Sequence, residues 1–62
     1  MNSVRNCRDM KHLTQEQLGH HVGVSRQTIV AIEKGNYTPS VALAMDLAKI
    51  LDCPVEQLFY WK

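Results

Sequence analysis

The chain has 62 residues and a mass of 7.1 kDa; 45% of its residues are hydrophobic, 21% are charged, and the formal net charge is +1. A domain of this size buries only about 60% of the surface that its unfolded chain exposes, which leaves one core and no space for a catalytic domain with a lid and a substrate cavity. No apolar run approaches the roughly 20 residues of a membrane span, and residues 1–10 lack the apolar stretch of a signal peptide. We therefore expect a single domain over residues 1–62, located in the cytoplasm.

The charges are distributed unevenly along the chain. Residues 1–38 contain five arginines and lysines against three acidic side chains, together with all three histidines, whereas residues 39–62 contain two lysines against three acidic side chains. A mildly basic half permits a polyanionic partner, although ordinary solvated surface explains the same charges equally well.

Five helices are predicted in chain order, with short segments between them. Thr14, Ser25 and Ser40 each offer a side-chain oxygen to the first free backbone N–H groups of a helix. Thr14 and Gln17 have the spacing of a capping box, and Pro54 suits the first turn of the last helix. The predicted helices span residues 2–11, 15–22, 26–34, 41–51 and 55–60.

The ends of these helices are also marked in the sequence. Gly23 and Gly35 can adopt the left-handed conformation that ends a helix at low steric cost, and Asp52 can do so less comfortably. The fourth predicted helix is apolar around most of its circumference, so we expect it to be central. Its apolar stripe is formed by Leu43, Ala44, Leu47, Ala48, Ile50 and Leu51.

The second and third predicted helices are joined by a tight turn. Gly19 lies inside the second helix and permits the close approach of a helix that crosses it steeply, despite the cost of glycine in a helix interior. Gly23 can take the positive φ that the turn requires, and Leu18 can pack under Ile29 and Ile32. This arrangement predicts a helix-turn-helix.

Five stretches of the chain carry a family resemblance: Leu13-Thr-Gln-Glu-Gln-Leu-Gly, Gly23-Val-Ser-Arg-Gln-Thr-Ile, Ile32-Glu-Lys-Gly-Asn-Tyr-Thr-Pro-Ser, Ala44-Met-Asp-Leu-Ala-Lys-Ile-Leu and Val55-Glu-Gln-Leu-Phe. In this order and spacing they resemble the Xre-type, Cro/CI-like (lambda-repressor-like) helix-turn-helix family over nearly the whole chain. The resemblance implies an all-α, compact five-helix domain that binds operator DNA, usually as a dimer.

In such a domain the third helix enters the major groove and presents its N-terminal residues to base edges. The resemblance therefore implies base contacts from Ser25, Arg26, Gln27, Thr28, Val30 and Ala31. Arg26 can donate to guanine O6 and N7, and Gln27 can pair with adenine. Val30 and Ala31 face outward if the two isoleucines of the helix face inward. They would then offer apolar contact to a thymine methyl group. The alternative for Arg26 and Gln27 is an ordinary solvated helix start.

Residues on either side of the reading helix resemble the backbone-contacting positions of the family: Thr14, Gln15, Lys34, Asn36, Tyr37 and Thr38. Free N–H groups at a helix N-terminus attract phosphate, and Gln15 can also brace a reader such as Arg26. These contacts position the protein rather than select a sequence. Tyr37 can at the same time cover the edge of the core with its ring.

The resemblance also implies an ion pair between Arg8 and Glu33 that ties the first helix to the third. A glutamate that faced phosphate would be repelled, which favours an inward pairing. His12 departs from the family, which commonly has glycine at the end of the first helix, so we expect a strained or differently shaped turn there.

Cys7 and Cys53 lie in apolar patterns, and without a secretion signal we interpret them as packed thiols rather than as a disulfide. The alternative is a metal site formed by Cys7, His12, His20 and His21. These residues lack the close pairing that places two ligands on one turn, so we expect no metal and no cofactor.

Three of the four aromatic residues lie together near the C-terminus. Tyr60 and Trp61 have no obvious place in the core, and an exposed aromatic patch is a good surface for self-association. We therefore predict a homodimer interface formed by Phe59, Tyr60 and Trp61; the alternative is that Trp61 folds back on its own domain. A two-fold dimer would place two reading helices about 34 Å apart, which matches a palindromic operator.

These features predict a sequence-specific transcriptional regulator, a repressor that binds double-stranded DNA at the nucleoid of a prokaryotic or phage-infected cell. The alternative is a protein-interaction module on the same scaffold, such as an antitoxin, whose aromatic tail serves a protein partner. An enzyme is disfavoured because no nucleophile and base are set beside a pocket. We expect neither a small-molecule ligand nor a membrane partner.

Overall fold

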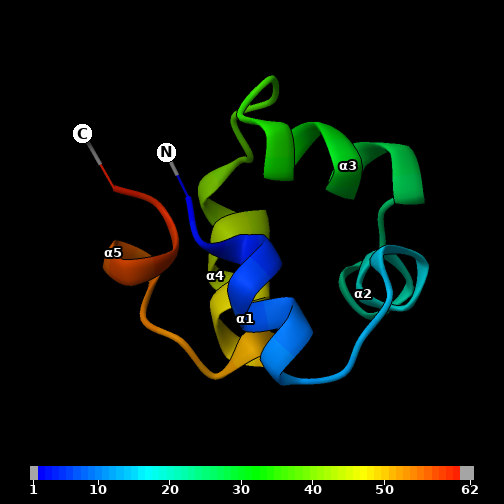
Figure 1. Ribbon diagram of the computed structural model, residues 1–62. Helices are drawn as coiled ribbons and strands as arrows, with labels where there is room; N and C mark the ends of the chain where they lie inside the picture. Colours follow the sequence, from blue (N-terminus) through cyan, green and yellow to red (C-terminus); the bar gives the residue numbers. More distant parts are fainter. Residues whose placement is uncertain (1, 61–62) are drawn as a thin grey trace.

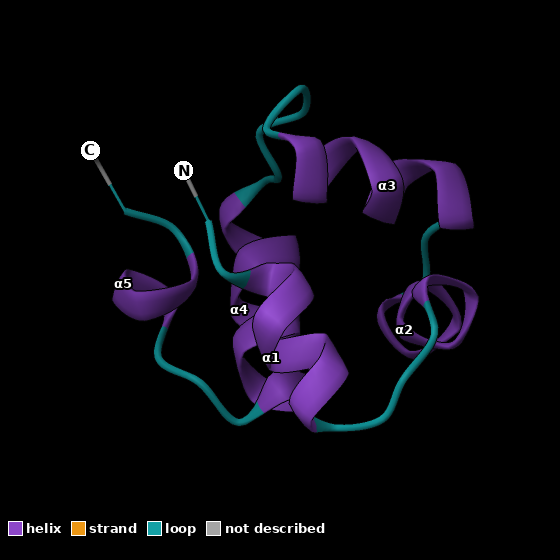
Figure 2. Cartoon of the chain, viewed as in Figure 1, coloured by secondary structure: helices purple, strands orange, loops and turns teal. Residues whose placement is uncertain are grey.

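The computed structural model describes residues 2–60, and five helices form this part of the chain (Figures 1 and 2). They are α1 (Val4–Met10), α2 (Gln15–Val22), α3 (Arg26–Lys34), α4 (Val41–Leu51) and α5 (Val55–Leu58). Extended pairing within residues 2–60 is limited to one antiparallel bridge between Asn2 and Phe59. The all-α fold expected from the sequence is therefore confirmed.

The first and last helices are shorter than the sequence predicted. α1 begins at Val4 rather than at residue 2 and is one residue shorter at its other end, while α5 ends at Leu58 rather than at residue 60. The reason is that the two end segments bind each other instead of extending the helices. Asn2 pairs with Phe59 in the bridge, and the Ser3 N–H donates to the Leu58 carbonyl at 2.9 Å. Figure 2 shows the two ends of the described chain side by side.

Side-chain caps begin the three middle helices where the sequence predicted them. Thr14 Oγ1 accepts from the Gln17 N–H at 3.0 Å and Gln17 Oε1 accepts from the Thr14 N–H at 2.9 Å, which completes the capping box. Ser25 and Ser40 accept from the N–H groups three residues later, at 3.2 and 3.1 Å. Pro54 differs from its predicted place, because it is the N-cap of α5 rather than part of its first turn.

Left-handed residues end the helices, and two of them are not glycine. Gly23 and Gly35 have φ of 78° and 80°, and Asp52 ends α4 with φ of 55°, as predicted. His12 follows α1 with φ of 58°. The left-handed conformation costs a residue with a side chain about 1–2 kcal/mol. The turn after α1 is therefore strained at His12, as we expected from the sequence.

α4 is the central helix, as its apolar sequence predicted. It packs against α1, α2 and α5, and Figure 1 shows it directly behind α1. The buried hydrophobic side chains of residues 2–60 are Val4, Leu18, Ile29, Ile32, Leu43, Leu47, Leu51 and Leu58. Three of them come from α4.

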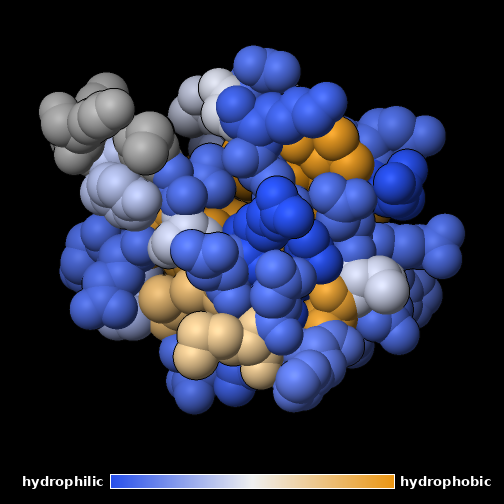
Figure 3. Space-filling view, viewed as in Figure 1, coloured by the Kyte–Doolittle hydropathy of each residue, from blue (hydrophilic) through white to orange (hydrophobic). Residues whose placement is uncertain are grey.

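Polar side chains cover most of the face shown in Figure 3, with parts of this apolar interior visible between them. Within residues 2–60, no helix has both the length and the apolar character needed to cross a bilayer.

Gly19 is a point of close approach between α2 and the segment that leads into α3. A Cβ placed on this residue would lie 2.6 Å from the Val24 carbonyl oxygen and 3.2 Å from the Ser25 carbonyl oxygen. Both neighbours are backbone atoms, which cannot swing aside as a flexible side chain would. Only glycine therefore fits between the two helices at this position.

Gly19→Ala is expected to destabilise the domain by about 2 kcal/mol, because over-packing outweighs the better helix propensity of alanine. Urea unfolding checks this against His20→Ala, an exposed neighbour on α2 that we expect to change stability by less than about 0.5 kcal/mol. Equal unfolding midpoints for Gly19→Ala and the parent chain would contradict the close approach.

Candidate nucleic-acid interface

α2 and α3 form a helix-turn-helix. α2 ends at its left-handed C-cap Gly23, and two residues later Ser25 caps α3. In Figure 1, α2 is seen down its axis while α3 runs across the view, so the two helices cross steeply. Leu18 of α2 and Ile29 and Ile32 of α3 are fully buried in the core. The buried side of α3 is thereby fixed, and its opposite side faces outward.

Two polar side chains at the start of α3 take no part in the cap. Ser25 Oγ accepts from the Thr28 N–H at 3.2 Å and lies 3.1 Å from Thr28 Oγ1, so both hydroxyls serve the helix start. Arg26 and Gln27 are exposed. A planar guanidinium and an amide are the groups that form paired hydrogen bonds with guanine and adenine edges in the major groove.

The outward side of α3 continues through Val30, Ala31 and Lys34, which follow Gln27 at helical spacing. Lys34 is exposed, but Val30 and Ala31 are half-buried rather than fully outward-facing. Val30 lines a hollow together with side chains of α1 and α2, which cover part of it. The two apolar residues therefore offer less surface to a partner than the sequence predicted.

Arg8 of α1 and Glu33 of α3 form an enclosed ion pair. Arg8 Nε donates to Glu33 Oε2 at 2.7 Å and Arg8 Nη2 donates to Glu33 Oε1 at 3.3 Å, while Nη1 donates to the Leu13 carbonyl at 2.8 Å. The two side chains are only 11% and 6% exposed. The hydrogen bond with Glu33 raises the pKa of Arg8, so the guanidinium stays charged wherever the domain is folded. The pair fixes how α1 meets α3.

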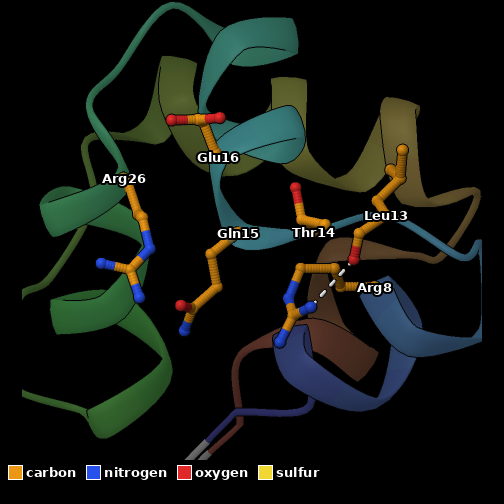
Figure 4. A pocket seen from close by; sticks show the side chains of 6 residues that line it. All are labelled: Arg8, Leu13, Thr14, Gln15, Glu16 and Arg26. Atoms are coloured by element: carbon orange, nitrogen blue, oxygen red, sulfur yellow. Dashed lines mark hydrogen bonds between the residues drawn. The ribbon is translucent and has the colours of Figure 1, made fainter.

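Gln15 extends this ion pair. Its Nε2 donates to Glu33 Oε1 at 3.1 Å, so Glu33 receives donors from α1 and from α2. The sequence suggested that Gln15 can also brace Arg26, which stays a prediction, because the amide that donates through Nε2 still has Oε1 to accept a hydrogen bond. Figure 4 shows the Gln15 side chain between those of Arg26 and Arg8.

An open hollow of about 460 Å³ lies between the start of α2 and the start of α3 (Figure 4). It is lined by Arg8, Leu13, Thr14, Gln15, Glu16 and Arg26. Because Arg8 is paired with Glu33, Arg26 supplies positive charge to the hollow, together with the free backbone N–H groups that begin α2. The Glu16 carboxylate belongs to the same lining, so the positive charge is confined to the side formed by Arg26 and the start of α2.

A second hollow, of about 340 Å³, separates α1 from α3 and reveals a residue that the sequence reasoning missed. Arg5 of α1 and Lys34 of α3 are both exposed and line it from opposite sides. Arg5 lies three residues before Arg8 and so shares its face of α1. That spacing is the signal that could have identified Arg5 once Arg8 was placed against α3.

The segment after α3 is exposed and polar, and it forms the green loop at the end of that helix in Figure 1. The predicted contact residues here are all exposed: Lys34 at the end of α3, then Asn36, Tyr37 and Thr38 in the segment. Tyr37 is 47% exposed, so about half of its surface is covered. This segment extends the polar surface beyond the C-terminal end of α3.

The residues predicted for self-association are described in part. Phe59 is half-buried and packs against the core, whereas Tyr60 is 43% exposed. Trp61, and with it the alternative in which this ring folds back on the domain, lies outside the described residues. Tyr60 is thus the exposed aromatic group on the described part of the predicted interface.

The alternative metal site is not assembled in the described chain. Within residues 2–60, no group of three or more histidine, cysteine or acidic side chains lies close enough to hold a metal ion. The His20 and His21 rings lie 6.3 Å apart, edge to face, on exposed α2 positions. Cys7 and Cys53 are both free thiols.

Comparison with known proteins gives consistent matches along the chain. A family model described as helix-turn-helix matches residues 4–58. An uncharacterized HTH-type transcriptional regulator of Methanocaldococcus jannaschii is 46% identical over 61 residues, which cover 98% of this chain and 92% of that protein. The transcriptional repressor RstR of the cryptic phage CTXphi, from Vibrio cholerae, is 33% identical over 55 residues, which cover 89% of this chain and 50% of that protein.

A solved structure matches as well. The restriction-modification controller protein C.AhdI from Aeromonas hydrophila superimposes with a TM-score of 0.81 at 32% sequence identity, covering 90% of this chain and 85% of that chain. The likeness therefore includes the whole helical framework and is not confined to α2 and α3.

Proposed function

This chain belongs to the Cro/CI-like helix-turn-helix family of DNA-binding transcriptional regulators, and on that premise we propose that it represses transcription by binding a palindromic operator as a homodimer. The observation that carries the proposal is the pair of exposed polar side chains, Arg26 and Gln27, at the start of α3. The family is one of regulators rather than of enzymes. Such a repressor occupies its operator and excludes polymerase, and it acts at the nucleoid in the prokaryotic cytoplasm.

In the proposed complex α3 lies in the major groove and Arg26 and Gln27 meet base edges. Each subunit thereby reads a short half-site, with guanine opposite Arg26 and adenine opposite Gln27. Val30 and Ala31 are half-buried and add apolar contact to a thymine methyl group. Contacts from Ser25 and Thr28 are weaker in this proposal, because their hydroxyls already serve the cap.

Phosphate contacts flank the reading helix in this proposal. One set comes from the start of α2, where Thr14 and Gln15 border the hollow beside Arg26. The other comes from Lys34 and the exposed residues Asn36, Tyr37 and Thr38 that follow it. We add Arg5, since it faces the same hollow as Lys34. Arg5 and Lys34 then contribute two phosphate-contacting cations per subunit, while Arg26 reads base edges.

Affinity for DNA is expected to fall steeply with salt. Two phosphate-contacting cations in each of two subunits displace about four counterions, which gives a slope of about −3.6 for the logarithm of the association constant against the logarithm of salt concentration. Lys34→Ala removes two of these contacts per dimer and should flatten the slope by about 2. Fluorescence anisotropy with labelled duplex DNA measures both values.

Lys11→Ala is the matched control for charge, because Lys11 follows the end of α1 that lies away from α3. Its Nζ lies 3.8 Å from Asp52 Oδ2. The slope for this variant should equal that of the parent chain. Two results would contradict the proposed interface. One is an affinity for DNA that does not change with salt concentration, and the other is an equal loss of affinity in Lys34→Ala and Lys11→Ala. Failure to bind any duplex would favour the protein-interaction alternative.

The homodimer part of the proposal is supported by energetics and by exposed apolar surface. A single subunit with few cations binds DNA weakly, whereas the second subunit of a dimer binds the same duplex at a high effective concentration. Tyr60 is exposed beside Phe59 at the end of the described chain. An aromatic group in such a place is favoured at interfaces.

We expect a dimer mass for the parent chain in sedimentation at roughly tens of micromolar, the range in which modest interfaces associate. Tyr60→Glu should give a monomer that melts at nearly the same temperature, since this side chain is exposed, and should lose most operator affinity. Met10→Glu, which changes an apolar residue that is 79% exposed elsewhere on the surface, should stay dimeric. A monomeric parent chain that binds its operator tightly would contradict the dimer.

A further inference from the structure

Cys7 and Cys53 are far apart in the sequence, but the fold brings them to one hollow of about 430 Å³. Both are free thiols, both are half-buried and both pack against the edge of the core. Cys7 comes from α1 and Cys53 from the connection between α4 and α5. The hollow is also lined by Met10, and Figure 3 shows a pale hydrophobic patch at this lower end of the molecule.

Neighbouring contacts hold the two sides of this hollow together. Lys11 lies one turn after Cys7, and its Nζ is 3.8 Å from Oδ2 of Asp52, the residue before Cys53. The Cys53 thiol lies 3.9 Å from Gln57 Oε1. Interaction with the Cys7 thiol raises the pKa of Cys53, and both residues line the same hollow.

We propose that Cys7 and Cys53 form a dithiol site that hydrogen peroxide oxidises to an intramolecular disulfide, joining α1 to the α4–α5 connection. The Cys7 thiolate attacks one oxygen of the peroxide and the O–O bond breaks, which gives a sulfenic acid on Cys7; the leaving hydroxide takes up the proton that the thiol released and becomes one water molecule. The Cys53 thiolate then attacks the sulfenic sulfur, the S–O bond breaks, and the hydroxide takes up a proton as a second water molecule. Two thiols lose two electrons and two protons, and the peroxide is reduced.

The same disulfide forms if Cys53 attacks first and Cys7 resolves the sulfenic acid, because both thiols line the hollow. In a reducing cytoplasm the pair rests as two thiols, and the disulfide is its oxidised state.

The disulfide is expected to stabilise the domain without changing DNA binding. It closes a loop that spans most of the chain, which restricts the unfolded state and should raise the melting temperature by roughly 10 °C or more. Neither cysteine lines the two hollows beside α3. In Figure 1 the α4–α5 connection passes the end of α1 that lies away from α3, so the reading face is untouched.

The test treats the full chain with hydrogen peroxide and measures intact mass, free thiols and melting temperature. We expect a monomeric chain lighter by two hydrogen atoms, no thiol left for maleimide labelling, a peptide that links Cys7 to Cys53, and a higher melting temperature that dithiothreitol reverses. Cys7→Ser and Cys53→Ser serve as controls, and neither should lose those two hydrogen atoms nor gain stability on oxidation.

Three results would overturn the proposal. The first is oxidation that joins two chains instead of two cysteines of one chain. The second is a gain of oxygen on each cysteine without a cross-link. The third is an internal disulfide that lowers the melting temperature, because such a bond would distort the fold instead of closing the hollow between the two cysteines without strain.

Discussion

Glu33→Ala is expected to destabilise the domain by about 3 kcal/mol, because the largely enclosed charge of Arg8 loses its hydrogen-bonded partner. Arg8 is 11% exposed, and it would lose both hydrogen bonds to Glu33 while keeping its bond to Leu13 and its ion pair with Asp9 at 3.4 Å. Gln15 would lose its acceptor as well. A domain of this length has a total stability of only about 3–9 kcal/mol, so the variant should lose between about a third and all of it. Urea unfolding, monitored by far-ultraviolet circular dichroism, measures the loss.

Two further variants separate the ion pair from other effects. Lys11→Ala removes an exposed ion pair, in which the side chains are 43% and 87% exposed, and should change stability by less than about 1 kcal/mol. Replacing both partners, as in Arg8→Met with Glu33→Leu, should recover much of the loss because no unpaired charge remains. An unchanged melting temperature in Glu33→Ala would refute the role assigned to the pair.

The second large effect is expected from Arg26→Ala in DNA binding. A bidentate contact from arginine to guanine contributes about 1–3 kcal/mol of discrimination, and a dimer makes it twice, so operator affinity should fall by about 2–6 kcal/mol. The loss should be confined to operators that carry guanine at the contacted position. Arg26 is exposed, so the melting temperature should stay the same.

Lys34→Ala provides the contrast, because Lys34 is also an exposed cation on α3 but is placed against phosphate. It should weaken binding to operator and random DNA alike, with base preference retained. Competition titrations with single-base operator variants distinguish the two patterns. If Arg26→Ala weakened binding to every sequence equally, Arg26 would be a backbone contact and the reading assignment would be wrong.

The fold could be predicted closely from the sequence because its local signals agree. Capping side chains and left-handed glycines mark the ends of α2 and α3, and their predicted bounds match the structure. The predicted ends of α1 and α5 were wrong, and the reason is physical. The bridge between Asn2 and Phe59 joins the two ends of the chain, and helical periodicity carries no information about pairing over such a distance.

The candidate site was predictable where one helix determines it and less so where three helices meet. The outward position of Gln27 follows from the inward position of Ile29 and Ile32, and Arg26 is exposed as the first residue of α3. The partner of Gln15 does not follow, because it depends on how α1 and α3 bring Arg8 and Glu33 together. The nearness of Cys7 to Cys53 is likewise a product of packing and has no local sequence signal.

Selection of bound sequences from a pool of random duplex DNA tests the central claim most directly. The account predicts enrichment of a palindrome with two copies of one half-site, their centres separated by about one helical turn, or 34 Å. Each half-site should contain a guanine whose preference disappears when the selection is repeated with Arg26→Ala. Enrichment of a single unrepeated site would contradict the dimer, and a pool in which no sequence is enriched would contradict sequence reading by α3.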